Sequence, residues 1–295
     1  MPTNEQRRAA AKRKLERQLE RRTRQARRQR ILGIVGAVVA AVVLAGVAGY
    51  SVWYANHDKN TKASAAASSS GTTTPAAAGD LSGLPPLPPF TPAADLGANC
   101  QYPASPEQPS TPVNPPHSGK VPTEPATVSV SMVTDQGNIG LLLANNESPC
   151  TVNSFVSLAQ QKFFDGTQCH RLAASAALSV LQCGDPKGDG TGGPGYQFAN
   201  EYPTDQYKPD DPALHEPVVY PRGTLAMANS GPNTNGSQFF MVYKDSQLPP
   251  EYTVFGKIQD DGLATLDKIA KGGVAGGGDD GPPAIAVTIK SVRLD

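Results

Sequence analysis

The feature that most constrains this chain is residues 31–56, which contain no charged side chain. Ala, Val, Leu and Gly dominate this run, and Tyr50, Trp53 and Tyr54 lie near its end. A helix that spans a bilayer needs about 20 apolar residues, and aromatic residues are enriched where such a helix meets the headgroups. Residues 31–56 are therefore predicted to form one transmembrane helix. A cleaved signal peptide is the alternative, but its apolar core usually has only about 7–15 residues.

Charge is distributed unevenly around this run. The whole chain is neutral, yet residues 1–30 hold twelve Lys and Arg against three Glu, a net charge of +9. Positive residues beside a membrane helix stay on the cytoplasmic side. We therefore expect a single-pass cell-membrane protein with a cytoplasmic N-terminus and the remaining residues outside. Anionic lipid is the expected partner of this basic segment. Nucleic acid is the alternative, and the membrane span and the −9 carried by the rest of the chain argue against it.

Residues 57–125 have the composition of a linker. Ala, Ser, Thr and Pro dominate them, with the run LPPLPPF at positions 84–90. Large apolar residues are few, so little burial is available to offset the loss of chain entropy. Pro-rich chain is also stiff and extended. The sequence predicts a spacer that separates the membrane from a domain at residues 126–295.

That domain combines short strand-like stretches with two helix-like ones. Apolar alternations and short apolar runs predict strands at residues 127–133, 139–143, 163–172, 178–182 and 285–289. One helix is predicted to begin at Ser148 as the cap and Pro149 as the first helical residue, and another to end at Gly272. Many short strands with two helices are typical of an antiparallel barrel capped by helices.

The most distinctive stretch is GTLAMANSGPNTNGSQFFM at residues 223–241. Two apolar ends enclose a turn-rich centre, which predicts a strand, a long ordered loop and a second strand. Loops held on a rigid sheet are frequent places for binding groups. Four further motifs accompany it in a fixed order: FDGTQCHR at 164–171, LQCGD at 181–185, GTGGPGY at 190–196 and YTVFG at 252–256.

Together these motifs resemble those of the cyclophilins, the peptidyl-prolyl cis-trans isomerases, over residues 127–295. The resemblance implies a mainly β fold, namely a closed eight-stranded antiparallel barrel capped by two α-helices. It also implies catalysis of rotation about Xaa-Pro bonds, with Pro-containing polypeptides as partners and no cofactor or metal. A non-catalytic module that binds Pro-containing partners is the alternative.

The resemblance also implies the residues of the site. Arg171 matches the catalytic residue, Phe240 the floor of a proline slot and Leu248 an apolar wall. The other residues implied to bind substrate are Gln182, Gln238, Ala228, Asn229, Leu178, Val180 and Tyr252, the last standing where many members have His. The chain departs from the family at residues 173–180, which are longer and less apolar. Gln247 replaces a Trp of cyclosporin-sensitive members, so cyclosporin binding is expected to be weakened.

Four cysteines remain, Cys100, Cys150, Cys169 and Cys183, and no C-x-x-C pair occurs among them. An even number outside the membrane favours disulfides over free thiols, and four cysteines allow three connectivities. The resemblance implies that Cys169 pairs with Cys183, because their strands are neighbours in the family's barrel. It thereby implies that Cys100 pairs with Cys150.

Residues 188–193 satisfy the pattern G-x-G-x-x-G. A dinucleotide-binding loop of this kind must open a helix. Here Pro194 and Gly195 follow at once. These residues are therefore predicted to form an ordered loop without a cofactor.

Overall fold

The computed structural model describes residues 81–295. The basic segment, the predicted transmembrane helix and the first part of the predicted spacer lie outside the described residues. Within the described part, no helix is long and apolar enough to cross a membrane.

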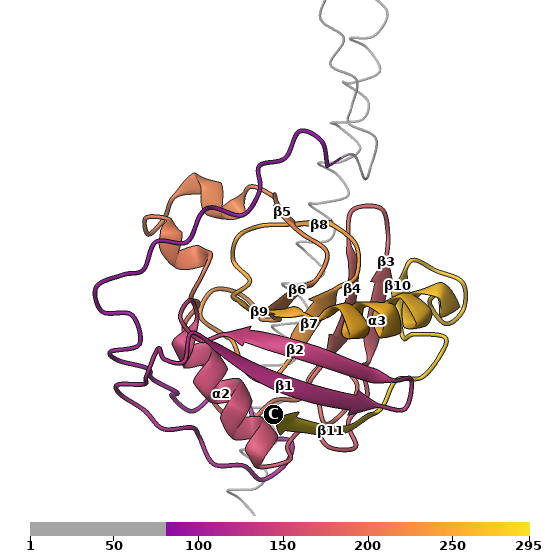
Figure 1. The fold of residues 1–295 in the computed structure, drawn as a ribbon, viewed down its shortest axis with the longest axis horizontal. Coiled ribbons are helices and arrows are strands. Elements are labelled where there is room, and N and C mark those ends of the chain that lie inside the picture. Colours follow the sequence, from indigo (N-terminus) through magenta and orange to yellow (C-terminus); the bar gives the residue numbers. More distant parts are fainter. Residues whose placement is uncertain (1–80) are drawn as a thin grey trace, which may run out of the picture. The chain divides into compact units, whose positions relative to one another are not determined.

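The domain is built around one curled, nine-stranded sheet in the order β10-β3-β4-β7-β6-β9-β2-β1-β11 (Figure 1). Its strands are β1 (Thr127–Thr134), β2 (Asn138–Ala144), β3 (Arg171–Ala174), β4 (Ser179–Cys183), β6 (Thr224–Met227), β7 (Phe239–Val242), β9 (Val254–Ile258), β10 (Asp280–Gly281) and β11 (Ile289–Leu294). A separate small sheet pairs β5 (Val218–Tyr220) with β8 (Ser246–Leu248). The 3-10 helices η1 (Thr204–Gln206) and η2 (Pro212–His215) precede β5.

The prediction of a closed, eight-stranded barrel is wrong. The sheet has nine strands and two edges, β10 and β11, that do not pair with each other. The strand predicted at residues 163–172 begins only at Arg171, because the chain before it turns through positive φ at Lys162 and Gly166. In place of that missing part of the strand, Gln168 alone forms isolated β-bridges, one to Asp185 and one to Thr288. The last strand likewise begins at Ile289 rather than at residue 285.

Two α-helices pack against the sheet, as the spacing predicts. Helix α2 (Pro149–Gln160) buries Val152 and Phe155, and α3 (Asp260–Gly272) lies against β2. Ser148 is the N-cap residue and Pro149 begins the helix, as predicted, but the Ser148 side chain makes no capping bond, because its Oγ donates to the carbonyl of Val254 at 2.7 Å. The buried carboxylate of Glu201 instead accepts hydrogen bonds from the N–H groups of Cys150 and Thr151, at 2.9 and 2.7 Å. A distant acidic residue thus satisfies donors that a helix start leaves free.

Residues 81–125, called here the wrapping segment, are not a spacer. They run along the outside of the domain, from beside β5 to beside α2 (Figure 1). Cys100, Tyr102 and Val121 are buried in the main core. Sequence pattern missed this because a few large side chains and one disulfide, not a periodic apolar face, hold the segment.

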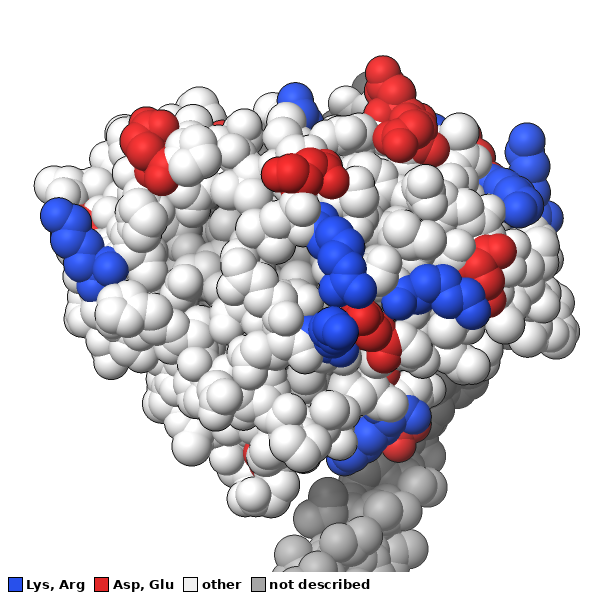
Figure 2. All heavy atoms as spheres, turned by 60° about the horizontal axis from the view of Figure 1, so that its bottom comes forward, with Lys and Arg blue, Asp and Glu red and all other residues white. Residues whose placement is uncertain are grey.

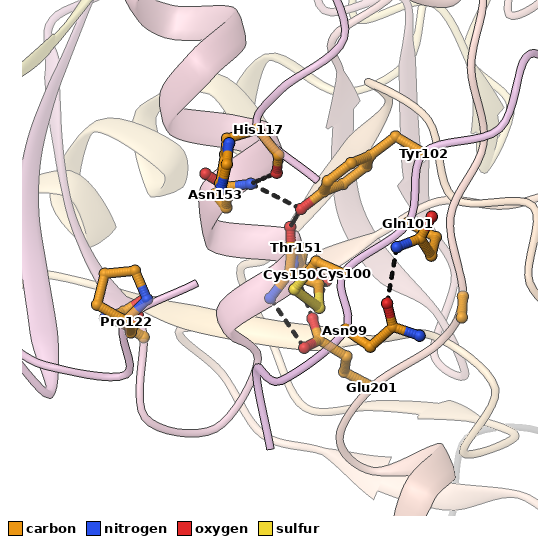
Figure 3. Close-up of a disulfide and its surroundings, with 12 residues drawn as sticks. Asn99, Cys100, Gln101, Tyr102, His117, Pro122, Cys150, Thr151, Asn153 and Glu201 are labelled. Atoms are coloured by element: carbon orange, nitrogen blue, oxygen red, sulfur yellow. Dashed lines mark hydrogen bonds between the residues drawn. A yellow bond between two sulfur atoms is a disulfide. The ribbon is translucent and has the colours of Figure 1, made fainter. Parts of the chain in front are cut away.

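Both expected disulfides are present. Cys100 joins Cys150 at the start of α2, and Cys169 joins Cys183 at the end of β4. Figure 3 shows the first bridge, with Tyr102 Oη donating to the carbonyl of Cys150 at 2.7 Å and accepting from Asn153 Nδ2 at 2.9 Å. The wrapping segment is thereby fixed to the helix by covalent and polar contacts.

Candidate functional site

Arg171 lies at the start of β3, directly opposite Gln182 on β4. Its Nε and Nη2 donate to the two carboxylate oxygens of Asp280 at 2.8 and 2.6 Å, and its Nη1 donates to Gln182 Oε1 at 3.2 Å. The hydrogen bonds with Asp280 raise the pKa of Arg171, and those same bonds lower the pKa of Asp280. Both groups are therefore charged at neutral pH, and the planar fork of the guanidinium is held in one orientation.

Arg171 is one end of a chain of polar side chains. Gln182 Nε2 donates to Gln238 Oε1 at 2.9 Å, and Gln238 Nε2 donates to the carbonyls of Gly190 and Gly192 at 2.9 and 3.0 Å. These bonds fix which end of each amide faces its neighbour, so an oxygen of Gln182 faces Arg171. The far end of this chain is anchored by the glycine-rich loop at residues 188–193, which is a loop, as predicted.

An apolar cluster lies beside this polar chain. Phe240, 5% exposed, pairs with Gln182 across β7 and β4, and its ring meets Tyr252 edge-on with centroids 5.7 Å apart. Val180 is buried in the same cluster. The cluster also packs three partly buried residues, Leu178, Ala228 and Leu248. The structure thus brings together every apolar residue that the sequence assigned to the proline slot.

A cavity of about 450 Å³ opens next to this cluster. Gln182, Gln238, Ala228 and Asn229 line it, so it shares residues with both the polar chain and the slot. The Asn229 side chain shapes its own loop by accepting from Gly231 N at 3.2 Å, and it ties that loop to a distant segment by donating to the carbonyl of Glu251 at 2.9 Å. The expected binding of a peptide by the Asn229 backbone stays a prediction.

Comparisons with known proteins identify the family. A family model described as cyclophilin type peptidyl-prolyl cis-trans isomerase matches residues 129–294. The chain belongs to the cyclophilin family. It is 71% identical, over 100% of this chain and 95% of the relative, to a "probable peptidyl-prolyl cis-trans isomerase B" of Mycobacterium tuberculosis. A protein of the same name from Mycobacterium leprae is 67% identical over the full length of both. A crystal structure of a Cryptosporidium parvum cyclophilin aligns with 57% of this chain and 98% of its own, at 29% identity and TM-score 0.46.

The segment that departs from the cyclophilin pattern is ordered. Residues 175–178 close the hairpin between β3 and β4, with Ser175 N donating to the carbonyl of Leu178 at 3.0 Å. Ser179 N donates to Ser246 Oγ at 2.9 Å, and Gln247 N donates to the carbonyl of Ala177 at 2.8 Å. The longer hairpin therefore packs on β8, the strand that carries Leu248.

Sequence reasoning missed two parts of the site. Asp280 gave no signal, because it stands in a Gly- and Asp-rich run without apolar periodicity. Leu87 and Phe90 of the wrapping segment pack against the cluster of Phe240, and Phe90 meets Tyr202 edge-on with centroids 5.6 Å apart. Both residues belong to the LPPLPPF run at positions 84–90. Large apolar side chains in an otherwise polar and Pro-rich segment were the signal that could have indicated this packing.

Proposed function

We propose that this cyclophilin accelerates rotation about Xaa-Pro bonds of polypeptides outside the cytoplasmic membrane and so assists their folding. The observation that carries the proposal is the guanidinium of Arg171, held by Asp280 and Gln182 beside the apolar cluster around Phe240. A fixed cationic donor next to an apolar slot is the arrangement that this reaction requires.

The reaction has to overcome the amide resonance barrier of about 18–20 kcal/mol. Conjugation is lost when the bond is twisted, so a catalyst must favour that state. The proline ring would seat on Phe240 against Leu248, while Arg171 donates to the carbonyl on the proline side and favours a pyramidal prolyl nitrogen. Arg171 acts by charge and hydrogen bonding, because a guanidinium does not deprotonate in proteins. Neither a covalent intermediate nor a cofactor is needed for this step.

The remaining polar groups would hold the substrate. Gln182 and Gln238 would bind the peptide and keep Arg171 aimed at the reacting bond, since they form one hydrogen-bonded chain with it. The backbone at Ala228 and Asn229 would bind the extended chain, as both residues line the cavity.

Two features support a location outside the cytoplasm. Residues 31–56 have the composition of a membrane anchor preceded by positive charge. The domain contains two disulfides, which persist in oxidising compartments. Anionic lipid would bind the basic segment on the cytoplasmic side.

The catalytic role of Arg171 can be tested with a matched pair of variants. Arg222 also forms a two-point ion pair, with Asp267 at 2.8 and 3.1 Å, and neither residue lines the cavity. Arg222 is about as exposed as Arg171. Arg171→Ala is expected to lower the rate of cis–trans exchange about 10²–10³-fold, as loss of a transition-state donor does in other enzymes. Arg171→Lys should recover little, and Arg222→Ala should leave the rate unchanged.

The rate is measured by NMR exchange spectroscopy on Xaa-Pro peptides with the full chain in detergent. An unmutated protein that binds these peptides without accelerating exchange would leave only the binding-module function. Protease added to spheroplasts tests the location: the domain should be digested and the basic segment spared. Full protection of the domain would reverse the orientation.

A further inference from the structure

The wrapping segment builds one wall of the cavity. Residues 103–110 lie against the glycine-rich loop, with Ser105 N donating to the carbonyl of Gly195 at 3.0 Å. Ser110 binds Gly193 twice, through its own N–H to the carbonyl at 2.9 Å and through its Oγ to the N–H at 3.0 Å. These residues precede the part of the chain that matches the cyclophilin model, which begins at residue 129. The wall is therefore an addition to the family domain.

Glycines let the two backbones approach this closely. A Cβ at Gly195, where φ is +79°, would lie 2.7 Å from Pro109 Cδ. A Cβ at Gly192 would lie 2.7 Å from Ser110 Oγ. The carbonyl of Gly192 is also an acceptor for Gln238, so the wrapping segment braces the loop at which the polar chain from Arg171 ends.

Among the described residues that line this cavity, Glu107 is the only charged one. Ser105 Oγ donates to the carbonyl of Glu107 at 2.7 Å, which fixes a turn at the rim. The Glu107 carboxylate is exposed and has no ion-pair partner among the described residues. Asp185 and Asp189, with Lys187 between them in the sequence, lie in or just before the glycine-rich loop against which residues 103–110 lie. On the face drawn in Figure 2, acidic and basic side chains are interspersed rather than gathered by sign. A ligand in the cavity would therefore meet Glu107 as the one charged side chain of the lining.

We propose that residues 103–110 complete a substrate subsite in this cavity, and that Glu107 makes it favour a basic side chain near the Xaa-Pro bond. The occupant is a Lys or Arg of the same polypeptide whose proline sits on Phe240. The cavity shares Ala228 with the apolar cluster and Gln182 with the polar chain from Arg171, so one extended peptide would reach both the cavity and the proline slot. This proposal rests on the proposed isomerase site and adds a determinant of substrate choice to it.

The test compares three peptides that differ only in Lys, Gln or Glu, placed in turn at each position flanking the Xaa-Pro pair. The full chain is used in detergent, unmutated and as Glu107→Gln and Glu107→Lys. The control is Asp95→Asn, which removes another exposed carboxylate of the wrapping segment that does not line the cavity. Turnover is read by NMR exchange and binding by fluorescence anisotropy of the labelled peptides.

At one flanking position, the unmutated protein should favour Lys over Gln by about two- to fivefold in kcat/KM, the range of an exposed ion pair. Glu107→Gln should abolish this preference, and Glu107→Lys should shift it toward Glu. The preference should fall as salt is raised. Asp95→Asn should retain it.

A preference that is missing from the unmutated protein, or that survives Glu107→Gln, overturns the proposal. If no peptide is turned over, the proposed function fails, and the anisotropy ratios still decide whether Glu107 selects basic residues. Loss of turnover for all three peptides alike in Glu107→Gln would assign Glu107 a structural role and would also overturn the proposal.

Discussion

Asp280 offers the sharpest test of how the site is held together. It binds two of the nitrogens of Arg171, at 2.8 and 2.6 Å, and leaves the third facing Gln182 at 3.2 Å. The two side chains are 39% and 47% exposed, so solvent screens their attraction. Removing Asp280 should therefore lower the free energy of unfolding by no more than about 1 kcal/mol.

Its effect on the reaction should be larger than its effect on stability. Without Asp280 the Arg171 side chain is free to change rotamer, and an Arg carries about 2 kcal/mol of rotamer entropy. Ordering it in the transition state would then reduce kcat/KM by up to about 30-fold in Asp280→Ala. Asp280→Asn keeps one acceptor, so we expect about a fivefold loss, equivalent to about 1 kcal/mol.

The measurement is cis–trans exchange by NMR, with urea unfolding of the same samples. Asp267→Ala is the matched control, because it breaks the corresponding ion pair of Arg222 away from the site. Asp280→Ala and Asp267→Ala should lose similar stability, and only the first should lose activity. Equal activities in both would show that Arg171 does not depend on Asp280, and the reasoning would be refuted.

Three further predictions concern stability and inhibition. Burial raises the pKa of Glu201 from about 4.5 to about 7, so the folded protein holds this proton more tightly than the unfolded chain does. The resulting contribution to the free energy of unfolding is fully present below pH 4.5 and is lost as the pH rises through 7. Glu201→Gln should remove about 3 kcal/mol of this pH dependence in urea unfolding, and an unchanged profile would contradict it. The Cys100–Cys150 bridge spans a separation of 50 residues, so replacing both cysteines by Ser should cost about 4 kcal/mol; unfolding free energies within 1 kcal/mol of each other would exclude this. Gln247→Trp should tighten cyclosporin binding at least about tenfold by calorimetry, through added aromatic burial and a hydrogen bond. Equal affinities would rule out this residue as the determinant.

The sequence predicted the centre of the site better than its surroundings. Arg171, Gln182 and Phe240 come together because each stands in a motif on a regular strand, where pairing fixes the neighbours. Asp280 reaches Arg171 from a two-residue strand in a glycine-rich run, whose conformation no local pattern specifies. A closed barrel was wrongly expected from the many short strands and from the resemblance. One of those strands, predicted at residues 163–172, is mostly absent because the backbone turns at Gly166.

The wrapping segment was missed for a different reason. Its Pro-rich composition indicates an extended chain, and extended it is, yet composition does not tell whether such a chain lies in solvent or on a surface. What holds it is a set of single contacts distributed along the segment, from Phe90 to Cys100 to Ser110. Each partner lies far away in sequence, so local periodicity carries no trace of it.

That arrangement has a consequence for the order in which the molecule assembles. Ser110 meets Gly193 across 83 positions of the chain, and Phe90 meets Tyr202 across still more. Contacts between such distant residues have high contact order and form late, since a long loop must close before they repay its entropy. During synthesis the wrapping segment is made before the residues that it contacts, so it cannot pack until they have been made. The rim of the cavity is thus completed only after most of the domain has been made, and a newly made chain lacks this wall of the cavity until then.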